Sequence, residues 1–374
     1  MAGLSGRRVW RPQLIVQRTS VGLDVHARSI VACAIDERTG EVVHRRFGYD
    51  PGGAIMWVKA LPGPQNVVYE AGPTGFELAR QFQASGVHCV VAAPSKLQRP
   101  SGDRVKTDAR DAEHLARLLR LGEVTTVRIP TREQEAARDL VRAREDVRTD
   151  LMAARHRLSK LLLRRGLVFD GKTTWSHEHD AWIRRHRPDL PGAAAAFDAA
   201  YETVAQIAAR KRHLDTLIAE AAVSDDEFAL VAARLGCLRG ISAHTAYALA
   251  VEIGDWHRFT GNTIGAYLGL VPTEHSSGAS RMQGAITKTG NAHARRLLVE
   301  SAWHHKKDYR PGAVMQSRWA AAPTDAVLRG QDGNRRLHRK WQQFTLRKKR
   351  STIAVVAVAR ELAGWCWSLA VMDR

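Results

Sequence analysis

The first third of the chain alternates short apolar runs with amphipathic stretches. Five runs rich in β-branched and other apolar residues predict strands, and three segments with helical periodicity predict helices. The predicted strands cover residues 19–25, 29–35, 41–48, 66–70 and 87–93, and the predicted helices cover 51–60, 75–85 and 108–120. Three strands in series, followed by alternating helices and strands, predict a mixed α/β sheet with helices on its faces.

A heptad pattern replaces the alternating pattern after residue 131. In 132–165, apolar residues recur every seven positions with a second apolar position between them, interrupted by Arg144, as in a coiled-coil seam. The first set is Leu140, Val147, Ala154 and Leu161, and the intervening set is Leu151 and Leu158. A second amphipathic stretch covers 201–222, and the residues between the two, 166–198, look irregular. The pattern predicts either a helical hairpin within one chain or a dimerisation arm, and it fits both equally.

The last third of the chain has the pattern of a mainly helical region. Residues 235–252 resemble a helix-hairpin-helix element, in which a glycine-bearing hairpin and a helix N-terminus present backbone N–H groups to a phosphate. Such a hairpin is also a common packing device, and Ser242 stands where the pattern usually has a second glycine. We expect a glycine- and serine-rich loop over 269–290 and apolar helices at 292–305 and 351–371.

The charge of the chain points to a polyanion partner. Its 374 residues include 57 Lys plus Arg against 38 Asp plus Glu, for a formal net charge of +19. Such a surplus attracts nucleic acid whatever its sequence, although a generally basic proteome is an alternative explanation. Trp341 and Phe344 interleave with cations in 335–350, which suits stacking on bases unless both rings turn into the core. The basic segment 1–18 is expected to be a flexible extension.

The cysteines and the hydropathy of the chain indicate the redox environment of the protein and its relation to membranes. Four scattered cysteines in apolar contexts are expected to be buried free thiols in a reducing cytoplasm, namely Cys33, Cys89, Cys237 and Cys366. No uninterrupted apolar run approaches the roughly 20 residues that span a bilayer. The sequence therefore predicts no transmembrane helix and no membrane partner.

Four acids fall where a ribonuclease H-like sheet would bring carboxylates together. Asp24 and Glu70 each end a strand-like run, and Asp108 and Asp111 lie three apart at the start of a helix, so they share a face. Clustered like charges repel, and such a set is tolerated mainly when a divalent cation neutralises it. The expected cation is magnesium (Mg2+), and the expected chemistry is transfer at a phosphodiester. Taken singly, each acid also fits a plainer role in a turn or at a helix N-terminus.

Several short motifs match one family in order and spacing. They are Gly22-Leu-Asp24-Val, Tyr69-Glu70-Ala-Gly-Pro-Thr-Gly75, Lys106-Thr-Asp108-Ala-Arg-Asp111-Ala, Arg239-Gly-Ile, Gly269-Leu-Val-Pro272 and Ser277-Gly278. With these motifs, residues 20–370 resemble the DEDD transposases of the bacterial insertion-sequence family numbered one hundred and ten. The resemblance implies an α/β plus α architecture: a RuvC-like (ribonuclease H-like) mixed sheet, a coiled-coil arm and a mainly helical C-terminal domain.

The resemblance also assigns roles to residues. By it, Asp24, Glu70, Asp108 and Asp111 become the magnesium ligands, and Ser277 becomes the nucleophile, with Ser276 as its immediate neighbour. The domains that it implies are a flexible basic extension (1–18), a RuvC-like DEDD catalytic domain (19–130), a coiled-coil helical arm (131–226) and a transposase domain with the catalytic serine (227–374).

Partners and a reaction follow from the same resemblance. It implies an RNA-guided DNA recombinase that acts on double-stranded donor and target DNA, with an element-encoded non-coding guide RNA. It implies a homo-oligomer, dimer or tetramer, in which the acids of one subunit face the serine of another, and a cytoplasmic, nucleoid-associated bacterial protein. Two rivals remain. One is a Holliday-junction-type endonuclease that uses the acids with water, and the other is a non-catalytic nucleic-acid-binding scaffold.

Overall fold

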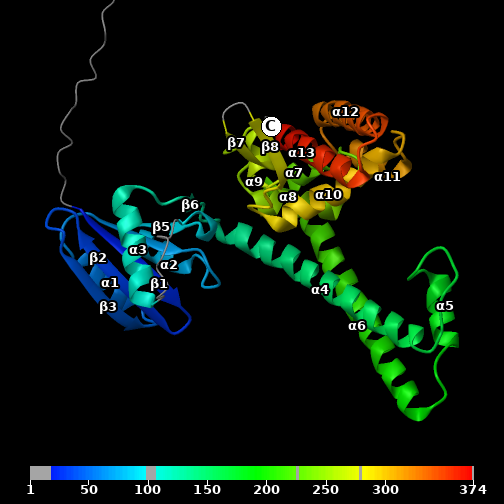
Figure 1. The fold of residues 1–374 in the computed structure, drawn as a ribbon, viewed down its shortest axis with the longest axis horizontal. Helices are drawn as coiled ribbons and strands as arrows, with labels where there is room; N and C mark the ends of the chain where they lie inside the picture. The colour runs from blue at the N-terminus through cyan, green and yellow to red at the C-terminus, as the bar shows by residue number, and fades with distance from the viewer. Residues whose placement is uncertain (1–17, 98–106, 225–226, 278–279, 373–374) are drawn as a thin grey trace, which may run out of the picture. The chain divides into compact units, whose positions relative to one another are not determined.

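The chain divides into two compact units, Met1–Pro130 and Thr131–Arg374, which are described separately. The computed structural model (Figure 1) describes residues 18–97, 107–224, 227–277 and 280–372, and the side chains of 275–281 lie outside that description. Of the expected basic extension, only Arg18 is among the described residues.

Unit 1 is built on a six-stranded mixed sheet with the strand order β3-β2-β1-β4-β5-β6 (Figure 1). The strands are β1 (Thr19–His26), β2 (Ser29–Asp36), β3 (Val42–Gly48), β4 (Gln65–Glu70), β5 (His88–Ala92) and β6 (Thr126–Val127). The first three form an antiparallel meander, β4 and β5 join β1 in parallel, and β6 closes the edge antiparallel to β5. All five predicted strands are confirmed to within one residue at each end. The two-residue β6 has no predicted counterpart, because so short a strand carries no periodicity.

Different helices cover the two faces of this sheet. The helices α1 (Pro51–Lys59) and α2 (Glu77–Ala84) pack on the face that carries Leu23 and Tyr69. Helix α3 (Asp108–Leu121) packs on the opposite face, where Ala112 and Ala116 meet Val31, Cys33 and Ile35. Because successive strand residues point to opposite faces, this division assigns every strand position to one helix layer or the other. The prediction of a mixed sheet with helices on its faces is confirmed.

Unit 2 begins with two long helices that pack together over much of their length (Figure 1). They are α4 (Arg132–Leu163) and α6 (Pro191–Ala221), with α5 (His177–Arg185) between them. The heptad positions Leu151, Ala154, Leu158 and Leu161 of α4 form one apolar cluster with Phe197 and Val204 of α6 and Ile183 of α5. In this chain the seam is therefore occupied by helices of the same chain.

The expectation of irregular structure over 166–198 is wrong. That stretch contains α5 and the first turns of α6, which begins at Pro191. The alanine run 193–196 that follows Pro191 consists of the residue with the highest helix propensity, and proline is favoured in the first helical turn.

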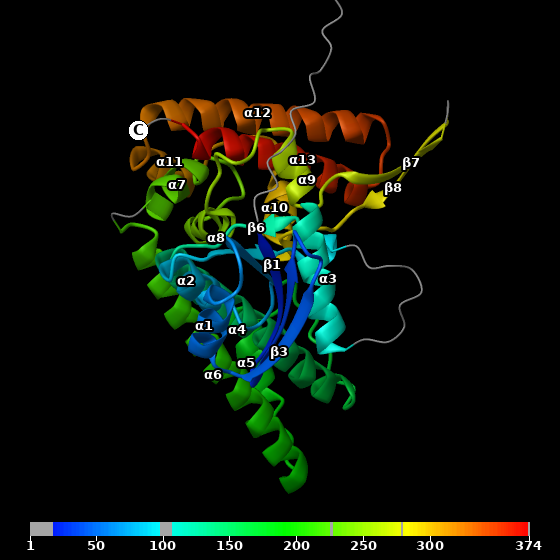
Figure 2. The same ribbon diagram turned by 90° about the vertical axis from the view of Figure 1, so that its left-hand side faces the viewer.

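The rest of unit 2 is mainly helical, with one β-hairpin. Its elements are α7 (Glu227–Leu235), α8 (Ala243–Ile253), α9 (Thr263–Tyr267), β7 (Pro272–Ser277), β8 (Ser280–Ile286), α10 (Ala292–Ala302), η2 (Trp303–Lys306), α11 (Ala313–Ala320), α12 (Thr324–Leu346) and α13 (Ser351–Ala370). Figure 2 shows α12 and α13 side by side and the β7–β8 hairpin extending away from the helices. The expectation of a loop over 269–290 is wrong at this hairpin, whose polar sequence lacks the apolar alternation that marks half-buried strands.

The core of this part of unit 2 centres on α8 and α13. By length and composition alone, α13 could cross a membrane, with a mean hydropathy of 1.4. Its residues Val358, Leu362, Cys366 and Leu369 are instead fully buried against the other helices of the unit. We therefore describe α13 as a core helix. All four cysteines are buried and free, as expected.

The segment between α7 and α8 shows why a glycine is needed at position 240. Gly240 has φ +83°, and a Cβ there would lie 2.4 Å from the carbonyl oxygen of Ser301. The hairpin is thus packed directly against α10, in keeping with the packing alternative. Ser242 caps α8, because its side chain accepts a hydrogen bond from the Thr245 N–H. Phosphate binding by this hairpin stays a prediction.

A buried carboxylate ties α4 to α8 and α10. Glu252 is 1% exposed and accepts two hydrogen bonds from the Arg142 guanidinium, at 3.0 and 2.9 Å. The Asn291 amide donates to it at 2.7 Å, and a ring nitrogen of His293 lies 3.1 Å away. Burial alone would raise the pKa of Glu252, but these partners outweigh it and hold the pKa well below its usual range.

Candidate active site

The position of α3 on the sheet depends on the absence of a side chain at Gly22. A Cβ built there would lie 2.0 Å from the carbonyl oxygen of Ala112 and 2.5 Å from the amide nitrogen of Ala116. Helix and strand backbones are therefore in direct contact at this point. Asp24 lies two residues further along β1 on the same face, and Asp108 lies one helical turn before Ala112, so the contact brings the start of α3 beside Asp24.

The register between β1 and β4 places a second acid beside Asp24. Leu23 pairs with Tyr69 across the two parallel strands, and both side chains belong to the layer covered by α1 and α2. Asp24 and Glu70 are the next residues of the two strands, so they share the opposite face, which α3 covers. Val68 supports this assignment, because it packs with Leu115 of α3 and precedes Glu70 by two residues.

The remaining two acids lie in the first turn of α3. Thr107 caps the helix by accepting a hydrogen bond from the Arg110 N–H, and threonine is among the residues favoured at this position. Asp108 and Asp111 follow in the first turn, where a carboxylate also interacts favourably with the helix dipole. This plainer role and metal binding are compatible, because both leave the carboxylate oxygens at the helix N-terminus.

His26 joins this group, although the sequence pattern drew no attention to it. One ring nitrogen lies 3.0 Å from an oxygen of Asp24 and 3.7 Å from an oxygen of Asp108. Possible ligand atoms of Asp24, His26 and Asp108 all lie within 4.8 Å of one another. The signal that could have found His26 is strand alternation, because a residue two places after Asp24 shares its face. Arg46 also approaches, with a guanidinium nitrogen 3.8 Å from Asp108.

The electrostatics of Asp24 show that the acids repel one another. Partial burial raises the pKa of the Asp24 carboxyl above its ordinary value, and the charges of Asp108 and Asp111 raise it further. His26 opposes this shift through its charge and its hydrogen bond. A bound cation would remove the repulsion, and carboxylate oxygens are the ligands that Mg²⁺ prefers. The residues of this site therefore fit a divalent metal.

The structure brings the predicted acids together to different degrees. Among the described residues, Asp24, His26 and Asp108 form a candidate metal-binding group. The carboxylates of Glu70 and Asp111 lie outside this group, although Asp111 is close enough to raise the pKa of Asp24. The roles of all four acids as magnesium ligands stay predictions.

The predicted nucleophile lies in unit 2. Ser277 is the last residue of β7. Its backbone pairs with that of Ser280 in β8, and the backbone of Ser276 pairs with that of Arg281. The side chains of both serines lie outside the described residues.

Comparison with known proteins gives two matches to family models. Residues 21–165 match a family described as "Transposase", whose name carries the labels DEDD and IS110. Residues 232–316 match a family described as "Transposase IS116/IS110/IS902 family". The first match contains all four acids, and the second contains Ser277.

Three relatives align over most of their length. The chain is 37% identical to y4qE of Sinorhizobium fredii (strain NBRC 101917 / NGR234), a candidate transposase by its name, over 94% of this chain and 88% of that protein. It is 28% identical to the transposase for insertion sequence element IS1533 of Leptospira borgpetersenii, over 89% of this chain and 99% of that protein. It is 26% identical to the transposase for insertion sequence element IS1111A of Coxiella burnetii, over 81% and 82% of the two chains.

Proposed function

The chain belongs to the IS110 family of insertion-sequence transposases, and we propose that it cuts and rejoins DNA with a serine nucleophile and a metal-assisted RuvC-like site. The observation that carries the proposal is the convergence of Asp24 and Asp108, from a strand and a helix, on one side of a sheet. Asp111 contributes charge to the same place. Such a cluster suits phosphodiester chemistry, in which a cation must stabilise negative charge on oxygen.

The acids would hold Mg²⁺, with Glu70 and Asp111 completing the set that begins with Asp24 and Asp108. When bound, the metal would supply Lewis acidity toward the phosphate oxygens. His26 would keep the Asp24 carboxylate oriented through the 3.0 Å contact between them. The magnesium identity rests on the oxygen-rich donor set.

The cutting step is a transesterification at phosphorus. The Ser277 oxygen forms a bond to a DNA phosphorus while the bond from that phosphorus to the 3′ oxygen breaks, and the serine proton ends on the released 3′ hydroxyl. The strand is then attached to the protein through a 5′ phosphoserine. A 3′ hydroxyl from another strand displaces the serine and restores both the phosphodiester and the serine hydroxyl. One phosphodiester is exchanged for another, so the reaction needs no ATP.

The wider assembly follows from the family and the charge. We propose that an element-encoded guide RNA pairs with donor and target DNA, so that base pairing supplies the sequence specificity. The formal net charge of +19 suits a protein that holds several polyanions at once. A dimer or tetramer, with acids and serine supplied by different subunits, remains part of this proposal.

Strand cleavage by a serine variant tests the proposal against its rival. Ser277→Ala protein should leave supercoiled donor DNA uncut and form no covalent protein–DNA adduct, while Ser276→Ala, the neighbouring control, should keep both activities. Continued cutting by Ser277→Ala, with loss of cutting in Asp24→Asn, would instead establish a junction nuclease that uses water. If both Ser277→Ala and Asp24→Asn still cut the DNA, neither the serine recombinase nor the junction nuclease would be correct.

Sequencing of co-purified RNA tests the guide. Protein isolated from cells that carry the native locus should retain one discrete RNA encoded beside the gene. Random cellular RNA, or none, would contradict the guided mechanism and leave a plain DNA-cutting enzyme.

A further inference from the structure

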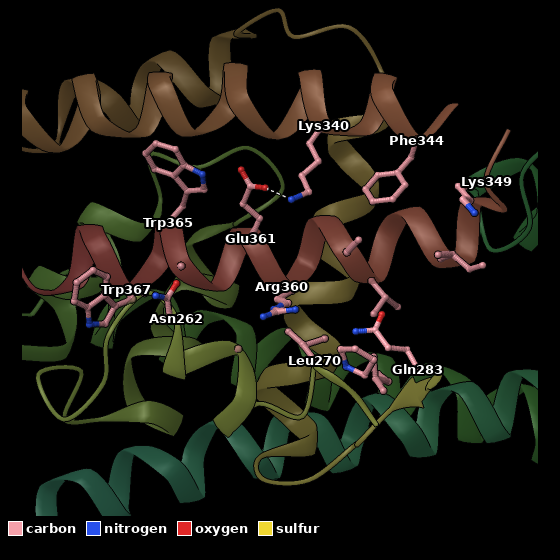
Figure 3. Close-up of a pocket in the computed structure, with 18 of the residues that line it drawn as sticks. Asn262, Leu270, Gln283, Lys340, Phe344, Lys349, Arg360, Glu361, Trp365 and Trp367 are labelled. Atoms are coloured by element: carbon pink, nitrogen blue, oxygen red, sulfur yellow. Dashed lines mark ion pairs between the residues drawn. The ribbon is translucent and has the colours of Figure 1, made fainter. Parts of the chain in front are cut away.

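Unit 2 contains a large open pocket that the catalytic proposal does not use. It lies among α9, the β7–β8 hairpin, α12 and α13, and has a volume of about 1130 Å³. We call it the α12–α13 pocket. Its size is close to the roughly 300–1,000 Å³ of typical small-molecule sites. In Figure 3, Lys340 and Phe344 extend from α12 toward α13, and Glu361 and Trp365 extend from α13 toward α12.

Aromatic and aliphatic side chains form much of the pocket wall. Phe344 is half-buried, so part of its ring remains exposed, while the neighbouring Trp341 is 2% exposed and belongs to the core. Of the two interleaved aromatics of the basic segment, Trp341 is therefore a core residue, while Phe344 packs partly against the core and also lines the pocket. Trp365 also lines the pocket, and the Arg329 guanidinium lies over its ring, 4.6 Å from the centroid. A flat ring with an exposed face is a surface on which a base stacks.

The pocket carries a surplus of positive charge. Four cations line it, Arg329, Lys340, Lys349 and Arg360, against the single carboxylate of Glu361. That carboxylate is already neutralised, because Lys340 lies 2.5 Å and Arg336 lies 2.9 Å from its oxygens. These two partners hold the pKa of Glu361 below its usual range, although burial acts in the opposite direction. Glu361 therefore stays ionised and leaves the other cations for a ligand.

Arg360 and Lys349 are the cations most open to an anion. Both are exposed, and within the described part of the chain neither side chain has a hydrogen bond or ion pair. The base of the Arg360 side chain packs on Gly265, where an added Cβ would lie 3.1 Å from the Arg360 Cγ. This contact anchors the aliphatic part of Arg360 at the pocket while its guanidinium remains exposed.

We propose that the α12–α13 pocket binds one unstacked nucleotide of single-stranded DNA, with the base against Phe344 and the flanking backbone phosphates on Arg360 and Lys349. An aromatic face beside unpaired cations is the combination that binds single-stranded nucleic acid. The choice of DNA rests on the proposed function. Pro272 and Ile286 pair with each other at the base of the β7–β8 hairpin and line the pocket, and Ser277 ends β7. Ser277 follows Pro272 by five positions along β7, a rise of about 17 Å, so a DNA strand at the serine could reach the pocket.

Photo-crosslinking locates the nucleotide directly. The probe is oligodeoxythymidylate that carries one 5-iododeoxyuridine, used with the full-length Ser277→Ala protein so that no cutting occurs. Irradiation should link the probe to tryptic peptide 341–347, which contains Phe344, or to 361–374, which contains Trp365. Crosslinks found only in other peptides would overturn the proposal. An oligouridylate probe that crosslinks to these peptides when the DNA probe does not would make the pocket an RNA site, which also overturns it.

Matched variants measure the contribution of each contact. Phe344→Ala should weaken binding of the DNA probe at least about fivefold, whereas Leu346→Ala, an exposed apolar residue of the same helix, should not. Arg360→Gln should lower the slope of log affinity against log salt concentration by about 0.7 more than Arg339→Gln, an exposed arginine of α12 outside the pocket. Because Arg360 is exposed, its variant tests the pocket even if Phe344→Ala fails to fold. Equal effects of each variant and its control would refute the assignment.

The two proposals fail in different ways. If Ser277→Ala still cuts DNA, the serine mechanism is wrong, but binding and crosslinking at the pocket are measured without reference to cutting. If the pocket variants bind DNA like their controls, the pocket assignment is wrong, while the cleavage result for Ser277 stands.

Discussion

Gly22→Ala is the most direct test of how the fold builds the acid cluster. The new Cβ would lie 2.0 Å from the Ala112 carbonyl oxygen, and ordinary van der Waals contact begins at 3.4 Å. The obstructing atoms belong to backbone and cannot rotate away. Helix α3 must therefore retreat from β1 by about 1.4 Å. Asp108 and Asp111 move with the helix, whereas Asp24 stays on the strand.

The expected cost follows from that displacement. A misplacement of about 1 Å among catalytic groups can reduce a rate about 100-fold. Overpacking against a core typically costs about 1–3 kcal/mol of stability, and contact with rigid backbone favours the upper end. We therefore expect Gly22→Ala to lower DNA cleavage about 100-fold or more and to increase hydrogen exchange at the amides of α3.

Gly48→Ala provides the matched control. Gly48 ends β3 of the same sheet, its φ is not positive, and nothing lies within 4 Å of an added Cβ. Single-turnover cleavage of donor DNA and hydrogen exchange of α3, measured on both variants, separate a local effect from a general one. Cleavage by Gly22→Ala at the wild-type rate would refute the account of the site, and equal losses in both variants would show that any added methyl disrupts the sheet.

The structure predicts the effects of three further substitutions. His26→Ala should raise the Mg²⁺ concentration for half-maximal cleavage about 10- to 100-fold, and an unchanged magnesium titration would remove His26 from the site. Glu252→Gln should cost about 1.5–3 kcal/mol near neutral pH by weakening charged hydrogen bonds. Because the folded pKa of Glu252 is depressed, the stability that its carboxylate adds is complete above the ordinary pKa of 4.5 and decreases as the pH falls below that value. The difference in unfolding free energy between wild type and variant, measured by chemical denaturation, should therefore be smaller below pH 4 than at pH 7. Leu158→Ala should cost about 2–5 kcal/mol, because the side chain is fully buried between the arm helices; a loss under about 1 kcal/mol in urea denaturation would show that this seam is not packed as described.

The strands of unit 1 could be predicted because buried strands leave a clear hydrophobic pattern in the sequence. β1 and β2 are buried on both faces, and their runs of apolar residues end abruptly at polar turns. The β7–β8 hairpin offers no such signal, since Gln283 and the 70% exposed Met282 face solvent along β8. The division of Trp341 and Phe344 between core and pocket was also beyond prediction, because it depends on the packing of α12 against α13.

The acids and the serine differ in how readily their roles can be predicted from the sequence. A carboxylate at the end of a buried strand is unusual in itself, so Asp24 and Glu70 could be singled out before any family was considered. A serine in a polar segment is ordinary, and its reactivity would come from groups brought to it by folding or assembly. The identification of Ser277 therefore depends on the family motif, and Ser276→Ala is a necessary control.

Strand alternation, applied strictly, would have recovered more of the site than the acids alone. Val31 lies opposite Asp24 on β2 and opposite Arg46 on β3, so all three point to the face that α3 covers. With His26 two residues after Asp24, the same face carries two basic side chains beside the acids. Arg46, whose guanidinium lies 3.8 Å from Asp108, would then compete for this carboxylate with a bound cation. Arg46→Gln should therefore lower the Mg²⁺ requirement for cleavage, opposite in direction to His26→Ala. A shift in the same direction for both variants would mean that Arg46 supports the acid cluster and does not compete with the cation.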